Sequence, residues 1–98
     1  MTDVRWTRRA LKDLQSIRDY VAMGSPHYAD LLANRIIDAS ERLRQFPRSG
    51  RVVPEFGHES VREIIVARYR LIYELEGDNA RVLAVHHGAR LLGSLGTE

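Results

Sequence analysis

Two neighbouring histidines and a group of arginines are the side chains of this 98-residue chain that could do chemistry. His86 and His87 follow a short apolar run, and adjacent side chains on a strand point to opposite faces of its sheet. They therefore cannot hold one metal ion together, and because no other ligand spacing is recognisable we expect no metal site. One of them could act as an acid or base near a phosphate, or could simply cap a strand end through hydrogen bonds.

Arg70 has the most demanding position among the arginines, because it lies within the alternating apolar segment 69–75. A half-buried guanidinium costs free energy unless an acceptor pairs with it. Glu63 or Glu74 across a sheet would be a structural partner. A phosphate, or a carboxylate of another molecule, would be a functional one. The sequence leaves both interpretations open.

Positive charge gathers in the middle of the chain. Fifteen basic residues, of which only Lys12 is a lysine, stand against thirteen acidic ones, for a net charge of +2. Residues 42–70 hold seven arginines against three glutamates, which is a net +4. A GC-rich source also favours arginine, and +2 alone is no sign of nucleic-acid binding. The position of the arginines is therefore more informative than their number. The absence of cysteine excludes disulfides and thiol catalysis.

The first half of the chain predicts one strand and two helices that would position these residues. Residues 3–6 alternate apolar and polar side chains, as a short strand does. Thr7 and Ser25-Pro26 are helix start signals. Apolar residues then recur every three or four positions over residues 10–21, and again from residue 28 to Phe46. We expect a helix of about four turns after Thr7 and a second over residues 25–46, joined tightly as an antiparallel hairpin.

The second half changes period. Residues 47–60 are rich in Pro, Gly and Ser and predict a loop. Three strands are expected over residues 61–66, 69–75 and 81–87, and their short connections imply an antiparallel meander. The order strand, helix, helix, strand, strand, strand predicts an α+β fold, with an antiparallel sheet packed against an antiparallel helical hairpin. A chain of this length fits a single domain, residues 1–98.

Four segments of the chain resemble the RelE/ParE toxin superfamily of type II toxin–antitoxin modules, whose fold has this same element order. The beginning Val4–Thr7 is similar to the first strand of the family. Phe46–Arg51 resembles its Pro-x-x-Gly-Arg loop, and Tyr69–Tyr73, after Val61-Arg62-Glu63, resembles its central hairpin. Val85–Arg90 resembles its closing His-Gly-x-Arg motif, which is more similar to the ParE branch.

This resemblance implies a toxin that inhibits growth, and the two branches of the family imply different targets. ParE-like members inhibit DNA gyrase and have no nuclease site. We favour that function, including the plasmid stabilisation typical of such modules. The resemblance then assigns target or partner binding to four arginines and implies no catalytic residue: Arg48, Arg51, Arg70 and Arg90.

RelE-like members are ribosome-dependent mRNA endonucleases, so whether the chain is an enzyme depends on the branch. Arg70 and Arg90 match the two arginines of RelE, but its C-terminal tyrosine is missing because no tyrosine follows residue 73. The related YoeB-like set of Glu, Arg and His is approximated by Glu55, Arg70 and His87. A non-toxic protein-binding module is the third alternative.

The resemblance also implies the partners. A cognate antitoxin would fold onto the toxin, and the exposed parts of the helical hairpin and sheet are the expected surface. The further partner would be DNA gyrase, or the ribosome and mRNA in the alternative branch. A homodimer and a toxin–antitoxin heterotetramer both fit. No cofactor is implied. We expect a cytoplasmic protein, since no apolar run is long enough to span a membrane and residues 1–20 lack a signal core.

Overall fold

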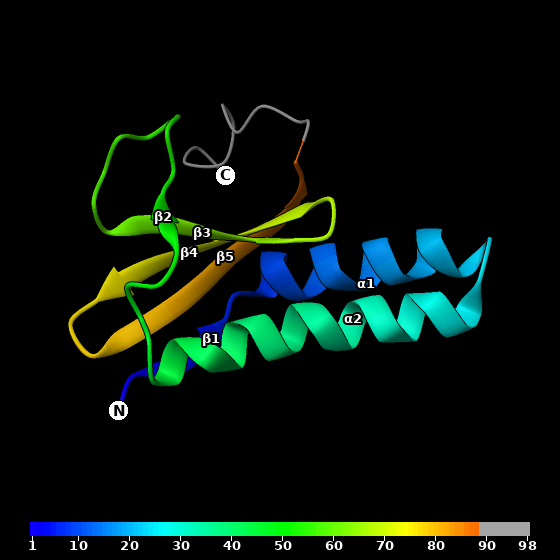
Figure 1. The fold of residues 1–98 in the computed structure, drawn as a ribbon, viewed down its shortest axis with the longest axis horizontal. Coiled ribbons are helices and arrows are strands. Elements are labelled where there is room, and N and C mark those ends of the chain that lie inside the picture. The colour runs from blue at the N-terminus through cyan, green and yellow to red at the C-terminus, as the bar shows by residue number, and fades with distance from the viewer. Residues whose placement is uncertain (89–98) are drawn as a thin grey trace.

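A computed structural model, which describes residues 1–88, shows a five-stranded sheet with two helices packed on one face (Figure 1). The elements in chain order are β1 (Asp3–Trp6), α1 (Arg8–Ala22), α2 (Pro26–Glu41), the short 3₁₀ helix η1 (Arg42–Arg44), β2 (Arg51–Val52), β3 (Val61–Val66), β4 (Tyr69–Glu76) and β5 (Asn79–His87). This arrangement confirms the predicted α+β fold.

The sheet has the strand order β1-β5-β4-β3-β2. The strands β3, β4 and β5 form the predicted antiparallel meander. The first strand adds to β5 in parallel, with Asp3 opposite Asn79, so the sheet is mixed at that edge. The parallel pairing was not part of the prediction, because local sequence pattern carries no information about which distant strand an N-terminal strand joins. At the other edge β2 pairs with β3.

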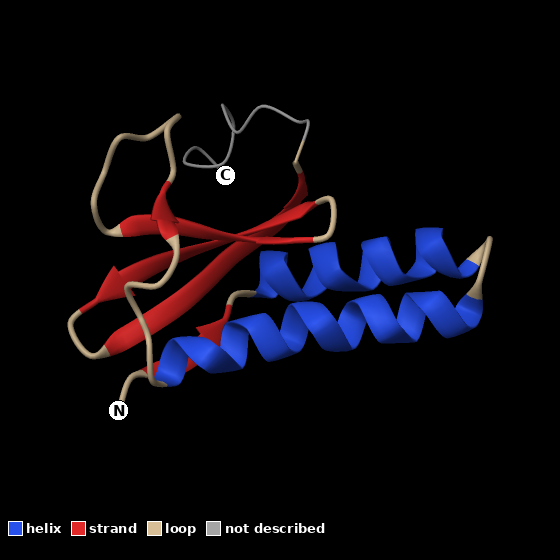
Figure 2. Ribbon diagram, in the orientation of Figure 1, coloured by secondary structure: helices blue, strands red, loops and turns tan. Residues whose placement is uncertain are grey.

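Both predicted helix starts are confirmed. The Thr7 hydroxyl accepts the backbone N–H of Ala10 at 3.1 Å, and the Ser25 hydroxyl accepts that of Tyr28 at 3.1 Å. Each side chain thereby satisfies a donor that has no partner within its helix. The two helices run antiparallel, and the end of their hairpin extends beyond the sheet (Figure 2).

The predicted extension of the second helix to Phe46 is wrong. The α-helix ends at Glu41, and η1 follows. A 3₁₀ helix turns further per residue than an α-helix, so side chains beyond it leave the apolar stripe. Phe46 is accordingly 61% exposed rather than part of the core.

The main core lies between the helices and one face of the sheet. Leu32 and Ile36 of α2 pack there with Leu71 and Tyr73 of β4 and Val82 of β5, all of them nearly or fully buried. The predicted alternation in β4 is confirmed, because Leu71 and Tyr73 face the helices. No helix in the described part of the chain is long and apolar enough to cross a membrane.

The opposite face of the sheet is partly covered by the segment 47–60, which we call the covering loop (Figure 1). Val53 of this loop is fully buried against Ile72 of β4, with Phe56, Val61 and Leu83 around them. The short strand β2 within the loop was not predicted, because two paired residues leave no periodicity to read. The loop thus brings its charged residues onto the sheet.

Candidate functional site

Strand register places three charged side chains on the loop-covered face. Glu63 of β3 lies opposite Arg51 of β2 on one side and Ile72 of β4 on the other. Arg70 stands two residues before Ile72, so its side chain leaves the same face of β4. The fourth charge, Glu55, comes from the turn in the covering loop that follows Val53.

These four residues form one ion network. Arg70 donates from Nε to Oε1 of Glu63 at 2.6 Å, and its two terminal amino groups donate to the two oxygens of Glu55 at 2.7 and 2.8 Å. Arg51 donates from Nε to Oε2 of Glu63 at 2.5 Å. The network of two arginines and two glutamates carries no net formal charge, so the whole of the net +4 over residues 42–70 comes from residues outside it.

Burial differs strongly along the network. The Glu63 side chain is fully buried and that of Arg70 nearly so, whereas that of Glu55 is 29% exposed and that of Arg51 is 64% exposed. Two hydrogen bonds from arginines offset the cost of removing the Glu63 carboxylate from water. Arg70 thereby has the structural partner expected from the sequence. Glu74, the other partner considered, pairs with Arg81 at 3.0 Å instead.

The bidentate contact changes the proton affinity of both partners. The hydrogen bonds from Arg70 lower the pKa of Glu55 to about 2, against a smaller opposing effect of burial. The pKa of Arg70 is raised, mainly by its hydrogen bonds to Glu55. Both side chains are therefore charged at any physiological pH.

A close approach of backbone to side chain fixes the beginning of the covering loop. The Tyr73 hydroxyl accepts the N–H of Gly50 at 3.0 Å and donates to the carbonyl of Pro47 at 2.8 Å. A Cβ on Gly50 would lie 2.6 Å from that hydroxyl oxygen and 2.7 Å from the carbonyl oxygen of Glu63, so only glycine fits. Burial raises the pKa of Tyr73, which keeps its hydroxyl protonated and able to donate. Pro47 and Gly50 of the loop motif thus both contribute to the contact that holds the loop to Tyr73.

Arg62 fastens the same loop from the helix-side face of β3. Its side chain donates to the main-chain carbonyls of Gly50 at 2.9 Å, Glu59 at 3.0 Å and Arg48 at 3.3 Å. Backbone carbonyls in a loop have few partners otherwise, and an arginine can serve several at once. Arg62 is therefore largely occupied with holding the loop.

Two of the remaining predicted site residues, Arg48 and His87, are not part of this network. Arg48 is exposed, and its contact with Glu59 is long, at 3.5 Å. His87 lies on the other face of the sheet, where its ring meets that of Tyr69 edge to face at 5.7 Å. Arg90 lies outside the described residues.

This geometry weighs against the nuclease set of Glu55, Arg70 and His87. A general base works best with a pKa near the operating pH, and the pKa of Glu55 is about 2. Arg70 already spends three N–H groups on carboxylates, and His87 is separated from both by the sheet. The described residues also contain no cluster of three side chains that could hold a metal ion.

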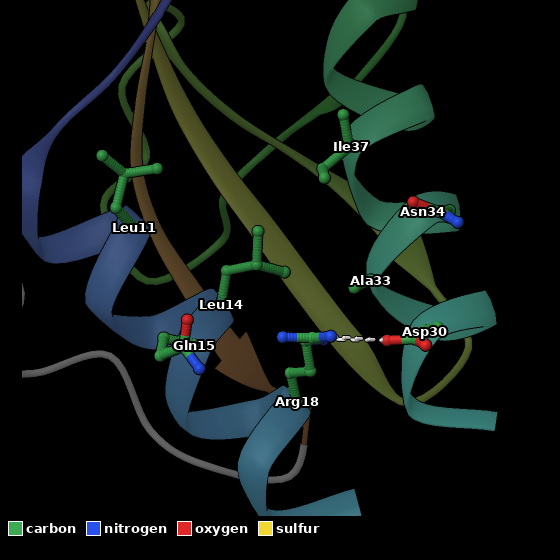
Figure 3. Close-up of a pocket in the computed structure, with 8 residues that line it drawn as sticks. All are labelled: Leu11, Leu14, Gln15, Arg18, Asp30, Ala33, Asn34 and Ile37. Carbon is green, nitrogen blue, oxygen red and sulfur yellow. Dashed lines mark hydrogen bonds and ion pairs between the residues drawn. The ribbon is translucent and has the colours of Figure 1, made fainter. Parts of the chain in front are cut away.

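A groove of about 600 Å³ runs between the two helices on their outer side (Figure 3). Leu11 and Leu14 of α1 and Ala33 and Ile37 of α2 supply its apolar part. Arg18 of α1 reaches across to Asp30 of α2 and forms an ion pair at 2.8 Å within the groove. Exposed leucine and isoleucine side chains in a concave site are typical of a surface that another protein covers.

Comparisons with known proteins agree with this architecture. The chromosomal ParDE toxin–antitoxin system from P. aeruginosa contains a chain that superposes with a TM-score of 0.74 at 24% identity, over 89% of this chain and 96% of that one. At this identity the similarity shows the fold. A hairpin of two helices on a five-stranded sheet is therefore a fold that also occurs in a solved toxin–antitoxin system.

Sequence comparison defines the family. The profile described as "ParE toxin of type II toxin-antitoxin system, parDE" matches residues 4–92. Toxin RelE2 of Caulobacter vibrioides is 35% identical over 93% of this chain and the whole of its own length. Putative toxin Y4kP of Sinorhizobium fredii is 34% identical over 86% of this chain and 85% of its own length. The chain belongs to the ParE toxin family of type II toxin–antitoxin systems, and its partner is a cognate antitoxin protein.

Sequence reasoning found Glu63 only as a potential partner of Arg70 and missed its contact with Arg51. The only signal for this contact was the opposite charge of Arg51 and Glu63. The register that places them opposite each other depends on β2, and a two-residue strand has no sequence pattern from which a register could be predicted. The bond between Glu55 and Arg70 was missed as well, because it depends on how the covering loop folds back.

Proposed function

We propose that this toxin acts as ParE-like proteins do, by inhibiting DNA gyrase, and that it acts in the cytoplasm as a single domain of residues 1–98. The observation that carries the proposal is the bidentate ion pair between Glu55 and Arg70. It occupies the two residues that a YoeB-like nuclease site would need, in a chain whose residues 4–92 match a ParE toxin profile. Binding of gyrase to exposed arginines of the loop-covered face, Arg48 and Arg51, and to Arg90 is part of this proposal.

The decisive experiment measures gyrase activity with the purified chain. We expect inhibition of supercoiling and accumulation of cleaved DNA, abolished when the antitoxin is added in equal amount. Topoisomerase I with the same plasmid is the control, because a non-specific DNA-binding protein would slow both enzymes. Full gyrase activity at a large molar excess of folded toxin would rule the proposal out.

The RelE-like alternative keeps one specific argument, the name of the 35% identical relative, Toxin RelE2. Ribosomes programmed with mRNA therefore belong in the same study. Cleavage of the message in the A site would favour the nuclease, particularly if Glu55→Gln and His87→Ala remove it while the protein remains folded. We expect intact mRNA.

The antitoxin, in this proposal, covers the groove between the helices and reaches the sheet. The groove is lined by four apolar and four polar side chains, a mixture that suits an amphipathic helix of a partner. Expression in cells provides the test. The chain alone should arrest growth, and co-expression with its antitoxin should restore it. Unaltered growth on expression of folded protein would instead support a non-toxic binding module.

The assembly formed with the antitoxin, whether one toxin with one antitoxin or a heterotetramer, is read from the mass of the purified complex by light scattering. The toxin alone, measured in the same way, distinguishes a monomer from a homodimer.

A further inference from the structure

The Arg51 guanidinium is held in place by a hydrogen bond at Nε, while most of the side chain is exposed to solvent. Its Nε–H donates to Glu63, whose carboxylate is fully buried, while the Arg51 side chain is 64% exposed. Within residues 1–88 this is the one hydrogen bond that the Arg51 side chain makes. A guanidinium has five N–H donors, so the four on the two terminal amino groups have no acceptor within residues 1–88, while the direction of the group is already set by Glu63.

The neighbouring arginines do not share this arrangement. Arg70 is buried and bound to two carboxylates, and Arg62 serves three main-chain carbonyls. Arg48 reaches only an exposed glutamate at 3.5 Å, so nothing fixes its direction. Among the described residues of the covering loop and its strands, Arg51 is thus the arginine that is both exposed and held in direction by a buried carboxylate.

An exposed apolar side chain lies on the same face of the sheet as this cation. Ile65 lies on β3 two residues beyond Glu63, on the same face of the sheet, and is 53% exposed. A nucleic-acid backbone is bound by several cations spread along it, and an exposed isoleucine adds nothing to a phosphate. A protein segment with an acidic side chain beside an apolar one would satisfy both residues.

We propose that Arg51 anchors a carboxylate of an acidic antitoxin segment, with Ile65 contacting an adjacent apolar side chain, and that Glu63 is the positioning residue for Arg51. The planar fork of arginine matches a carboxylate with two parallel hydrogen bonds. Because Glu63 orients the group beforehand, less side-chain freedom is lost on binding. This inference rests on the pairing with an antitoxin, and it holds whether or not Arg51 also contacts gyrase as proposed above.

The test measures the affinity of the full chain for the antitoxin encoded beside its gene, by calorimetry at two salt concentrations. Arg51→Ala should weaken binding at least tenfold. Arg51→Lys should weaken it about fivefold, because the charge stays and the fork is lost. Arg81→Ala is the matched control: it removes an arginine that also pairs with a glutamate, but an exposed one, and should change the affinity less than twofold.

The positioning role of Glu63 has its own measurement. The Arg51 Nε–H should give a resolved, slowly exchanging NMR signal in the free toxin. Glu63→Gln should remove that signal and weaken antitoxin binding about tenfold, although Arg51 is still present. If Glu63→Gln does not fold, two other measurements test the positioning role of Glu63. These are the Arg51 Nε–H signal in the unmodified protein and the antitoxin affinity of Arg51→Lys.

Two results would overturn the inference: an affinity of Arg51→Ala within twofold of the unmodified chain, or a rapidly exchanging Nε–H. Tighter binding of a 20-base-pair DNA duplex than of the antitoxin, lost in Arg51→Ala, would assign the residue to nucleic acid and overturn it as well. The gyrase assay on the same samples keeps the two proposals apart, since a toxin that leaves gyrase active can still lose antitoxin affinity with Arg51.

Discussion

The helix-covered face of the sheet buries a continuous set of apolar side chains, whereas the loop-covered face combines a small apolar cluster with an ion network. Apolar burial is non-directional and tolerates shape-conserving substitution. A buried ion network depends on every partner, since each charge is costly without its counterpart. The two faces should therefore be sensitive to different changes. The helix side should lose stability when side-chain volume is removed, and the loop side when a charge or a single hydrogen bond is removed or the pH is lowered.

Glu63→Ala should cause the largest loss of stability, and the loss should be specific to the loop-covered face. It leaves Arg70 buried with Glu55 as its remaining partner, and removing one member of a buried ion pair typically costs about 3–5 kcal/mol. Urea denaturation followed by circular dichroism measures the loss. Glu74→Ala is the control, because its partly exposed pair with Arg81 should contribute less than about 1 kcal/mol. Equal losses for both variants would mean that burial of the network contributes nothing.

Tyr73→Phe should produce the next largest effect. The ring stays in the main core, but the N–H of Gly50 and the carbonyl of Pro47 lose their partner. An unsatisfied buried polar group costs about 1–3 kcal/mol, and amide exchange at Gly50 should accelerate. Tyr69→Phe provides the comparison, because the Tyr69 hydroxyl makes no hydrogen bond within residues 1–88. A Gly50 amide that exchanges equally slowly in both variants would argue against the fastening role of Tyr73.

Acid should loosen the loop side before the helix side. The pKa of Glu55 is about 2 in the folded protein, below its ordinary value of 4.5, so its contribution is complete above pH 4.5 and is lost as the pH falls toward 2. The loss should amount to about 1 kcal/mol, since part of the carboxylate remains in solvent. Protease cutting within residues 47–60 across this pH range reports it. Glu55→Gln should flatten the dependence, and an unchanged slope would assign it to other carboxylates.

The smallest effect belongs to the helix side. Arg18→Ala breaks the ion pair with Asp30 between exposed parts of the two helices, and such pairs contribute about 0.2–1 kcal/mol. The midpoint of urea denaturation should change little, and the change should be smaller at high salt, which screens the ion pair. A loss as large as that of Glu63→Ala would remove the distinction between the two faces.

Most of the fold could be predicted because its signals are local. Thr7 and Ser25 begin helices through their own hydroxyl groups, and the alternation of residues 69–75 marks a strand with one buried face. What could not be predicted depends on distant contacts. The parallel pairing of β1 with β5, the two-residue strand β2 and the early end of α2 leave no periodic pattern.

The candidate site was predictable as a set of residue types but not as an arrangement. Arg70 was recognisable as a cation that needs a partner, and Glu63 was among the acceptors considered. Nothing local indicates that Glu55 would complete the network or that Glu63 would also hold Arg51. Binding of partners by Arg48, Arg51 and Arg90 stays a prediction.

The parallel pairing of β1 with β5 has a consequence for the order of events during synthesis. Asp3 pairs with Asn79, so the edge of the sheet formed by β1 closes only when most of the chain has left the ribosome. Contacts this distant in sequence slow folding, and until they form the apolar stripes of the helical hairpin lack the surface that buries them. During synthesis the nascent toxin therefore exposes, for a time, apolar residues of the helical segments that β4 and β5 cover in the folded protein.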